Sequence, residues 1–504
     1  MADTSNVTAP QKRPQDELQA VRKPSLSVNG MAHAPALFIF DATVLGGLVV
    51  WNALLFYSMA QRNMTDFGKF YYSAVAFLQG QDMYGPSAAI LAGVGGLVQH
   101  FGNMNPPHFH LLLLPLALLP AGLALALWSV ASLLSLVASS RLIVREVGLE
   151  LTPWQWRLGV LGLLSFIGTA GVLLTGQLSL LLLLPITLAW VEARRGRWTH
   201  AGVYLGLALS VKPFLLIFMP YLVFRRQFRA AAAAGVAASL CFVAGLLVFG
   251  VKAHWSWLEA VTAVDWTWAA MNASIFGVLS RALGSSRCCS PLVIAPGLIK
   301  PLWYASVGLV GTLTLAASTS NSTTETRDRD KDSGGGLITH HASRITRKIA
   351  VDRHFALLLL SSLLISPLGW AYYLWLPLGP LVALAVSWWP KTGSAGFQPA
   401  CRQDIGAPFT TSRLASPRSC AVRWRDGLLL VGITGLLWPF FATDIFQPHV
   451  WATVSVGSVY FWGTFALWSS LIVDWRIAAS AGLTTVERGN TLTGPDIREE
   501  QVGY

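Results

Sequence analysis

Apolar runs of about 20 residues or more recur along most of this chain, and they restrict its fold more than any other feature. A run of this length crosses the hydrocarbon core of a bilayer as a helix, because a helix satisfies its own backbone hydrogen bonds. Only 12% of the 504 residues are charged, against roughly 25% in an ordinary soluble domain. The sequence therefore predicts an all-α multi-pass membrane protein with about 10–12 transmembrane segments.

The basic residues indicate the orientation of these segments. The formal net charge is +12, which in a soluble protein would raise the possibility of nucleic-acid binding. Here the arginines gather in short polar segments between apolar runs, as the positive-inside rule expects of cytoplasmic loops, so no nucleic-acid partner is predicted. Placing the arginine-rich segments inside leaves 61–107 and 251–297 as the two substantial outside loops.

Composition divides the chain further. Two insertions and both ends are polar and lack apolar periodicity, which predicts disorder without a catalytic role. The absence of an organelle retention signal and the composition of the insertions favour the plasma (inner) membrane of a bacterium. The predicted parts are a cytoplasmic N-terminus (1–36), a membrane core (37–317), a linker (318–352), a membrane hairpin (353–389), a second linker (390–426), a C-terminal membrane hairpin (427–473) and a cytoplasmic tail (474–504).

Two apolar runs do not fit simple crossings. The run 200–224 has basic residues at both ends and Lys212-Pro213 in its middle, which predicts a broken or re-entrant hairpin. Such backbone persists at membrane depth only inside protein or beside a water-filled cavity. The run 108–143 has the length of one crossing plus a half-helix or of two short crossings, and the parity of the basic loops favours the first. We expect both segments to wall the active-site cavity.

The first outside loop contains the first candidate residue, Asp66. The segment from Thr65 to Gly80 has the pattern of an amphipathic helix lying in the membrane interface, with Thr65 or Asp66 at its start and Gly80 at its end. Asp66 could be only a helix cap stabilised by the helix dipole. It could also be a general base at the outer surface, kept ionised by Lys69 one turn on.

Lys212 is the second candidate. An ammonium at membrane depth costs several kcal/mol unless a partner compensates it. The lysine could form a structural salt bridge or extend its charge to the interface. Alternatively, it could be the cation that receives a phosphate leaving group.

The third candidate is a group in the second outside loop. Asn272, Ser274 and Arg281 follow an aromatic segment, and Ser274 and Arg281 would share a helix face. Indoles offer flat surfaces on which sugars stack, although anchoring at the membrane interface is the commoner role of such tryptophans. No metal-ligand spacing, disulfide framework or phosphate-binding glycine-rich loop is apparent, so no metal and no cofactor are predicted.

Taken in order, several motifs over about residues 40–390 resemble glycosyltransferase family 87. These are polyprenyl-phosphate-mannose-dependent membrane mannosyltransferases with a helical GT-C architecture. The residues that carry the resemblance are Asp66-(x5)-Tyr72, Gly80-Gln81-Asp82-Met83-Tyr84, Asn105-Pro106-Pro107, Pro115 to Pro120, Gly176-Gln177, Gly202-(x3)-Gly206 leading to Lys212-Pro213, Asn272-(x)-Ser274 with Arg281, and Ser366-Pro367-(x2)-Trp370.

The resemblance implies transfer of a hexose, typically mannose, from a polyprenyl phosphate to a hydroxyl of a glycolipid or glycan acceptor on the outer face, with inversion. It assigns the role of base to Asp66. The expected donor-binding residues are Lys212, Arg281, Gln177, Tyr72, Asn272, Ser274, Trp370, Tyr372 and Tyr373. The last two depart from the family, which often has a histidine pair there, and tyrosines can only hydrogen-bond a phosphate.

Two other function classes are compatible with the same pattern. A polytopic lipid or solute transporter, or a flippase, would also use a broken helix with a charge at membrane depth, but such proteins often show inverted repeats and none is apparent. An oligosaccharide polymerase or ligase would consume a diphosphate-linked lipid donor instead. The lipid donor that is consumed separates these alternatives.

Overall fold

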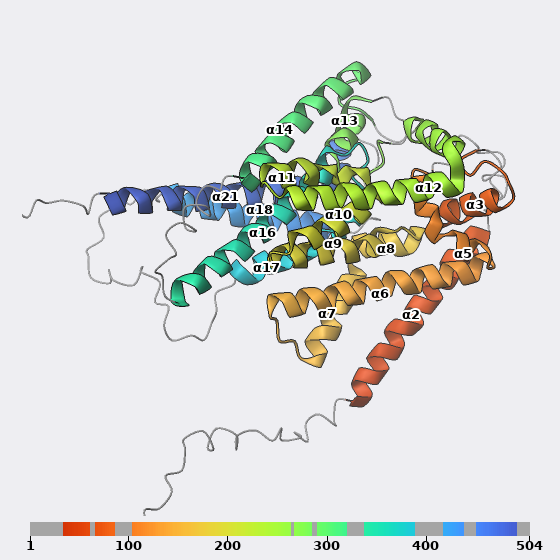
Figure 1. The fold of residues 1–504 in the computed structure, drawn as a ribbon, viewed down its shortest axis with the longest axis horizontal. Coiled ribbons are helices and arrows are strands. Elements are labelled where there is room, and N and C mark those ends of the chain that lie inside the picture. The colour runs from red at the N-terminus through yellow and green to blue at the C-terminus, as the bar shows by residue number, and fades with distance from the viewer. Residues whose placement is uncertain are drawn as a thin grey trace, which may run out of the picture. The chain divides into compact units, whose positions relative to one another are not determined.

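The computed structural model describes residues 34–60, 66–85, 103–263, 267–284, 290–319, 337–388, 417–437 and 450–490. The chain divides into two compact units, Met1–Trp51 and Asn52–Tyr504. In the first unit the described residues belong to the apolar helix α2 (Ala34–Ala60), which continues into the second unit. The other helices and 3-10 turns (η) are α3 (Asp66–Leu78), η2 (Pro107–Leu112), α5 (Leu114–Ala117), α6 (Ala121–Val147), α7 (Pro153–Ser165), α8 (Ile167–Thr175), α9 (Ser179–Arg194), α10 (Trp198–Val211), η3 (Pro213–Ile217), α11 (Phe218–Phe224), α12 (Phe228–Thr262), α13 (Ile275–Leu283), η4 (Pro296–Leu298), α14 (Ile299–Thr319), α16 (Leu337–Ile365), η5 (Ala371–Trp375), α17 (Leu378–Trp388), α18 (Pro417–Leu436), α20 (Val450–Val454), η6 (Val456–Ser458) and α21 (Val459–Asn490) (Figure 1).

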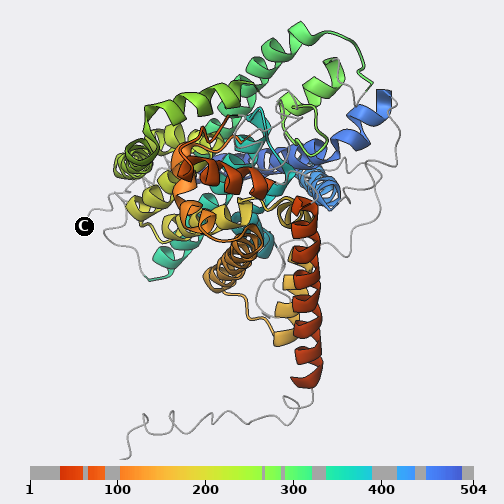
Figure 2. The same ribbon diagram turned by 90° about the vertical axis from the view of Figure 1, so that its right-hand side faces the viewer.

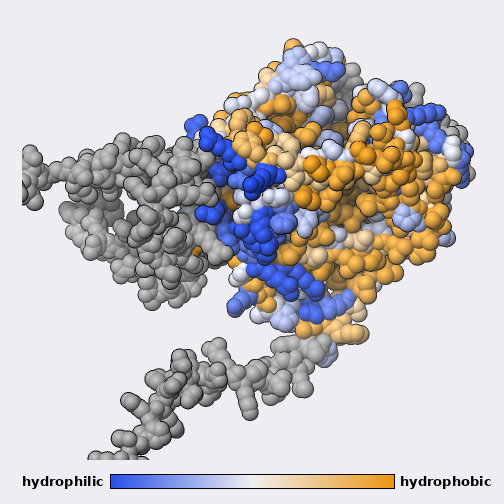
Figure 3. Space-filling model, viewed as in Figure 1, coloured by the Kyte–Doolittle hydropathy of each residue, from blue (hydrophilic) through white to orange (hydrophobic). Residues whose placement is uncertain are grey.

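The surface of these helices is apolar over wide areas (Figure 3). On α12, for example, Leu240 is 65% exposed and Leu247 is 81% exposed. Such side chains face lipid in a membrane protein. Four described segments are long and apolar enough to cross a membrane: Ala121–Val147, Phe228–Thr262, Pro296–Thr319 and Ala452–Ile477. The all-α multi-pass class is thus confirmed, and the count of 10–12 crossings stays a prediction.

Helices α6, α9, α10 and α12 pack in a row, with α9 between α6 and α10, and α10 also against α12 (Figures 1 and 2). The contact between α10 and α12 is close enough that a Cβ atom at Gly202 would collide with the backbone of Ala230. Small residues at such an interface let two membrane helices approach each other. The tight packing of α10 fixes the position of its last turn, which precedes Lys212.

The predicted irregularities of the apolar runs are confirmed. The run 200–224 is broken at Lys212, where φ is −130° and ψ is 90°, and continues as η3 and α11. The run 108–143 forms the short turns η2 and α5 followed by the single long helix α6, as one crossing plus a half-helix requires. Both breaks coincide with prolines, which cannot donate a helical hydrogen bond.

The predicted linkers and loops differ in part from the structure. Helix α16 begins at Leu337 and therefore covers the second half of the predicted disordered linker 318–352. Its polar residues are compensated by ion pairs, since Lys348 reaches Glu146 at 3.1 Å and the neighbouring Arg353 reaches Asp474 at 2.9 Å. Charges paired in this way can be buried in a helix that composition alone marks as a linker.

Three further helices also extend into segments that the sequence predicts as a loop, a linker or a tail. Helix α12 kinks at Gly250 and continues to Thr262 inside the predicted outside loop 251–297, helix α18 begins at Pro417 inside the predicted linker 390–426, and α21 continues to Asn490 inside the predicted tail. The remaining parts of both linkers, and residues 1–33, lie outside the described residues.

Candidate active site

Asp66 lies in the first turn of α3, where its carboxylate accepts two hydrogen bonds. Lys69 Nζ donates to Oδ1 at 3.0 Å, and Gln177 Nε2 donates to Oδ2 at 2.6 Å. The predicted helix and its lysine partner are confirmed, whereas Thr65 lies outside the described residues. An ionised carboxylate offers about four lone-pair positions, so Asp66 can still accept a further proton.

Gln177 reaches Asp66 because of the glycine before it. Helix α8 ends at Thr175 and is capped by Gly176. The φ of Gly176 is +69°, a left-handed conformation that glycine adopts without a penalty. A Cβ atom on Gly176 would collide with the Cβ of Phe67 in α3. The carbonyl of Gly176 also accepts a hydrogen bond from Trp128 Nε1 at 2.8 Å. This turn holds the following glutamine directly beside the start of α3.

The loop between α16 and α17 adds three aromatic side chains. Gln177 Nε2 also donates to Tyr372 Oη at 3.1 Å, so one amide connects the carboxylate to this hydroxyl. The rings of Trp370 and Tyr372 are stacked, with centroids 5.8 Å apart. Tyr373 is buried against Tyr372, with ring centroids 5.0 Å apart. Aromatic faces and hydroxyls of this kind suit a sugar ring.

Lys212 faces the same region from the break between α10 and η3. Its Nζ donates to Asn105 Oδ1 at 2.8 Å and lies 5.4 Å from the centre of the Tyr373 ring. Asn105 is itself held in place, because its carbonyl accepts a hydrogen bond from Tyr84 Oη at 2.6 Å. The ammonium therefore contacts one neutral acceptor and one aromatic face, and the carboxylate of Asp66 acts on it electrostatically.

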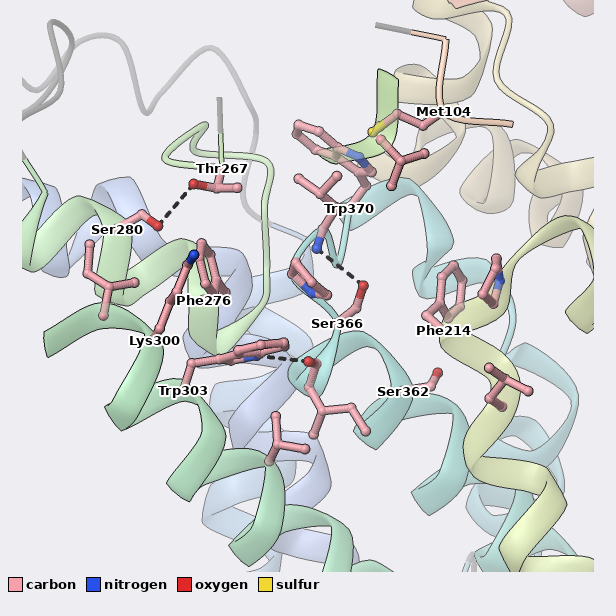
Figure 4. A pocket seen from close by; sticks show the side chains of 18 of the residues that line it. Met104, Phe214, Thr267, Phe276, Ser280, Lys300, Trp303, Ser362, Ser366 and Trp370 are labelled. Atoms are coloured by element: carbon pink, nitrogen blue, oxygen red, sulfur yellow. Dashed lines mark hydrogen bonds between the residues drawn. The ribbon is translucent and has the colours of Figure 1, made fainter. Parts of the chain in front are cut away.

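These residues line two pockets that share part of their walls. The smaller pocket, of about 330 Å³, contains Asp66 and Gln177 in its wall. The larger one, of about 1180 Å³, is mainly apolar and runs between η3, α14 and α16 (Figure 4). Four residues line both: Met104, Lys212, Trp370 and Tyr373. Lys212 thus lines both the small pocket that contains Asp66 and the large apolar pocket.

Three predicted site residues support the wall instead of lining the smaller pocket. Asn272 is fully buried and its Oδ1 accepts the backbone N–H of Gly369 at 2.9 Å. Ser274 caps α13 by accepting the N–H of Gly277 at 3.0 Å. Arg281, 1% exposed, donates to the carbonyl of Ala269 at 2.8 Å and, through Nε, to the hydroxyl of Ser458 at 2.9 Å. These bonds fix the segment that brings residues 269–271 to the smaller pocket.

Tyr72, the remaining predicted residue, lines neither pocket. Its ring packs against Tyr71 with centroids 5.1 Å apart. Burial raises the pKa of the Tyr72 hydroxyl above its usual value, which keeps the hydroxyl neutral. Within the described residues, no group of three or more histidine, cysteine, aspartate and glutamate side chains could hold a metal ion.

A comparison with protein-family models identifies the central part of the chain. Residues 103–328 match the model of glycosyltransferase family 87. The chain contains a glycosyltransferase family 87 domain. A comparison with curated proteins and a comparison with solved structures found no match. The recognition made from the motifs is confirmed, and with it a membrane glycosyltransferase as the class of protein.

The family 87 domain does not supply the whole site. It provides Asn105, Gln177 and Lys212, whereas Asp66 precedes the matched residues and Tyr372 follows them. Helix α3 and the loop after α16 therefore complete the pocket of the domain. The aspartate reaches the domain through a hydrogen bond to Gln177, and the tyrosine through the same amide.

Sequence reasoning did not single out Asn105, a polar residue of the smaller pocket, as a site residue. Asn105 was recognised only as part of the Asn105-Pro106-Pro107 motif, although its side chain is the acceptor for Lys212. The signal in that motif is the proline after Asn105, which restricts the backbone of the asparagine to extended conformations.

Proposed function

We propose that this protein transfers a hexose, with mannose as the expected sugar, from a polyprenyl phosphate to an acceptor hydroxyl on the outer face of the plasma membrane. It would act as an inverting hexosyltransferase that needs no cofactor. The observation that carries the proposal is the side chain of Lys212, which lines both the large apolar pocket and the smaller pocket that contains Asp66.

The shape of the pockets supports a lipid-linked donor. The larger pocket is lined by Phe214, Leu216 and Val307 among other apolar side chains, and it would remove a polyprenyl chain from water. The phosphate of the donor would meet the Lys212 ammonium, because hydrogen bonds between charged groups are stronger than those between neutral groups. The sugar would then enter the smaller pocket and lie against the indole of Trp370.

The chemistry follows from the two charged side chains. Asp66 accepts the proton of the acceptor hydroxyl, and the acceptor oxygen forms a bond to the anomeric carbon of the sugar. The bond from that carbon to the phosphate oxygen breaks, and polyprenyl phosphate leaves with the electron pair. Lys212 offsets the negative charge that develops on the leaving group. One such displacement inverts the anomeric centre.

The other side chains hold these groups in place. Gln177 and Lys69 fix the two oxygens of Asp66, so the base needs no reorganisation when the acceptor arrives. Tyr372 contributes a hydroxyl beside the sugar, and Tyr373 presents its ring to the ammonium. Asn272, Ser274 and Arg281 act as positioning residues through the wall of the pocket.

The test uses membranes that contain the full-length protein and radiolabelled polyprenyl-phosphate-mannose. Loss of a general base typically costs about 10²–10⁴-fold in rate, so we expect Asp66→Asn to lower transfer by that amount. Asp426→Asn is the matched control, because Asp426 is an exposed aspartate of α18 that lines neither pocket. We expect this control to retain transfer.

Three results would reject the proposal. Transfer that survives Asp66→Asn would remove the catalytic assignment. Labelled lipid that only changes leaflet would identify a flippase. Consumption of a diphosphate-linked donor, with the monophosphate untouched, would identify a polymerase or ligase.

A further inference from the structure

A buried amide, Asn103, connects the helix of the proposed base to the loop that contacts the proposed cation. Its side chain is fully buried and lines neither pocket. Asn103 Nδ2 donates to Ser73 Oγ at 2.8 Å and to His110 Nε2 at 2.8 Å. Asn103 Oδ1 accepts the backbone N–H of Asn105 at 3.2 Å and its side-chain Nδ2 at 3.4 Å. The amide therefore uses both of its hydrogens and both of its lone pairs.

These bonds fix the direction of the Asn105 amide. The nitrogen of that amide donates to Asn103, so its oxygen is turned toward Lys212, whose Nζ donates to Oδ1 at 2.8 Å. Without the Asn103 acceptor, the Asn105 amide could rotate and present its own N–H groups to the ammonium. An ammonium has no acceptor, so this contact would contain no hydrogen bond. The position of the cation therefore depends on Asn103.

The other side of the Asn103 amide is attached to helix α3. Ser73 is fully buried and lies seven residues after Asp66, about two turns along the same face of the helix. Polar side chains thus connect α3 to Lys212 through Asn103 and Asn105. A buried amide whose bonds are all satisfied rigidifies the segments that it joins. The cation is therefore held relative to the helix that contains the base.

Two further bonds attach the same loop to the fold without the Asn103 side chain. The carbonyl of Asn105 accepts a hydrogen bond from Tyr84 Oη at 2.6 Å. The carbonyl of Met104 accepts one from Trp257 Nε1 at 3.1 Å. Loss of the Asn103 side chain should therefore release the Asn105 amide while the loop stays in place. This separates an effect on the direction of that amide from an effect on folding.

We propose that Asn103 is a positioning residue of the transfer reaction, which holds the Lys212 ammonium in place relative to Asp66. It acts through the Asn105 amide on one side and the Ser73 hydroxyl on the other. This inference rests on the proposed transferase function. The base and the cation act on the same displacement, so a shift of one relative to the other lowers the rate of that step.

The first experiment measures the connection itself and does not depend on transfer. Hydrogen exchange of the full-length protein in lipid nanodiscs is followed by mass spectrometry. We expect Asn103→Ala to accelerate exchange of the backbone N–H of Asn105, which loses its acceptor. Ser361→Ala is the matched control, because Ser361 is also fully buried, bonds across helices to Thr314 Oγ1 at 2.6 Å and lines neither pocket. Equal exchange at Asn105 in wild type and Asn103→Ala would overturn the inference.

The second experiment measures transfer from radiolabelled polyprenyl-phosphate-mannose per amount of folded protein. We expect Asn103→Ala to lower kcat roughly tenfold without changing the KM for the donor. This loss is below the roughly 10²-fold that a misplacement of about 1 Å can cost, because the cation is still present. In the Lys212→Met background, Asn103→Ala should cost less than about threefold, since the group that it positions is gone. Ser361→Ala should keep the wild-type kcat.

A purely structural role of Asn103 predicts different results. A change confined to the donor KM, or the same loss of kcat with and without Lys212, would refute the inference. If Asn103→Ala does not fold, Ser73→Ala decides, because it removes the bond to α3 and leaves the acceptor of Asn105. Wild-type kcat in Ser73→Ala would then reject the connection. Wild-type protein that transfers no label would instead refute the transferase function, and the exchange measurement would still decide whether Asn103 holds Asn105.

Discussion

Replacement of Lys212 by methionine separates a catalytic role of this cation from a structural one. Methionine keeps an unbranched apolar side chain at the break between α10 and η3 and removes the ammonium. In the structure that ammonium donates to Asn105 Oδ1 at 2.8 Å and borders both pockets. If it stabilises the leaving phosphate, turnover must depend on it much more than folding does.

The magnitudes of the two effects differ. A preorganised donor aimed at charge that develops in the transition state contributes about 2.7–4 kcal/mol, or roughly 10²–10³-fold in kcat. The bond from Lys212 to Asn105 contributes about 1.5–3 kcal/mol to stability, but holding an ammonium away from water costs a comparable amount. We therefore expect Lys212→Met to insert and to melt near the wild-type temperature, with kcat lowered by about two to three orders of magnitude.

The assay compares initial rates with radiolabelled polyprenyl-phosphate-mannose for Lys212→Met and Asn105→Ala at matched expression. Asn105→Ala breaks the same hydrogen bond but keeps the cation, so we expect a much smaller loss of kcat. The reasoning is refuted if Asn105→Ala loses as much activity as Lys212→Met. It is also refuted if Lys212→Met keeps kcat within about threefold of wild type, since that ratio corresponds to less than 1 kcal/mol.

Two further predictions concern the support of the site. Gly176→Ala should lower the melting temperature and the activity more than Gly148→Ala does, since both glycines have positive φ but only Gly176 lies against Phe67. Equal losses in thermal melts would contradict this explanation. Arg281→Met and Ser458→Ala should not be additive, because they remove one shared bond. A double-mutant cycle on kcat should give a coupling of roughly 0.5–3 kcal/mol, and strictly additive effects would show that the bond does not matter.

The parts of the fold that the sequence predicts are those determined by local physical chemistry. The apolar runs depend on composition over about 20 residues, so the helical membrane class follows from them. The break at Lys212 follows from the adjacent proline, which lacks a backbone donor. The ion pair between Asp66 and Lys69 follows from a spacing of three residues in one helix. None of these features requires knowledge of a distant segment.

The features that could not be predicted depend on contacts between distant residues. Gln177 is 111 positions from Asp66, and only the folded chain shows that one glutamine amide holds the carboxylate. Arg281 is 177 positions from Ser458, its partner in the C-terminal part of the chain. The family resemblance predicts Arg281 as a donor-binding residue, but its donors are directed at carbonyls and a hydroxyl of the protein. Spacing along the chain contains no information about such partners.

The position of Arg281 changes the consequence of the tyrosine pair. At the positions where the resemblance implies two histidines, Tyr372 and Tyr373 cannot supply a positive charge to a phosphate. The sequence left Lys212 and Arg281 as the cations that could replace them. With the guanidinium of Arg281 bonded to the carbonyl of Ala269, Lys212 is the cation that borders both pockets. The ring of Tyr373 lies against the Lys212 ammonium, and the hydroxyl of Tyr372 accepts a hydrogen bond from the Gln177 amide that also holds Asp66. Substitution of the two tyrosines should therefore change the geometry around both Lys212 and Asp66.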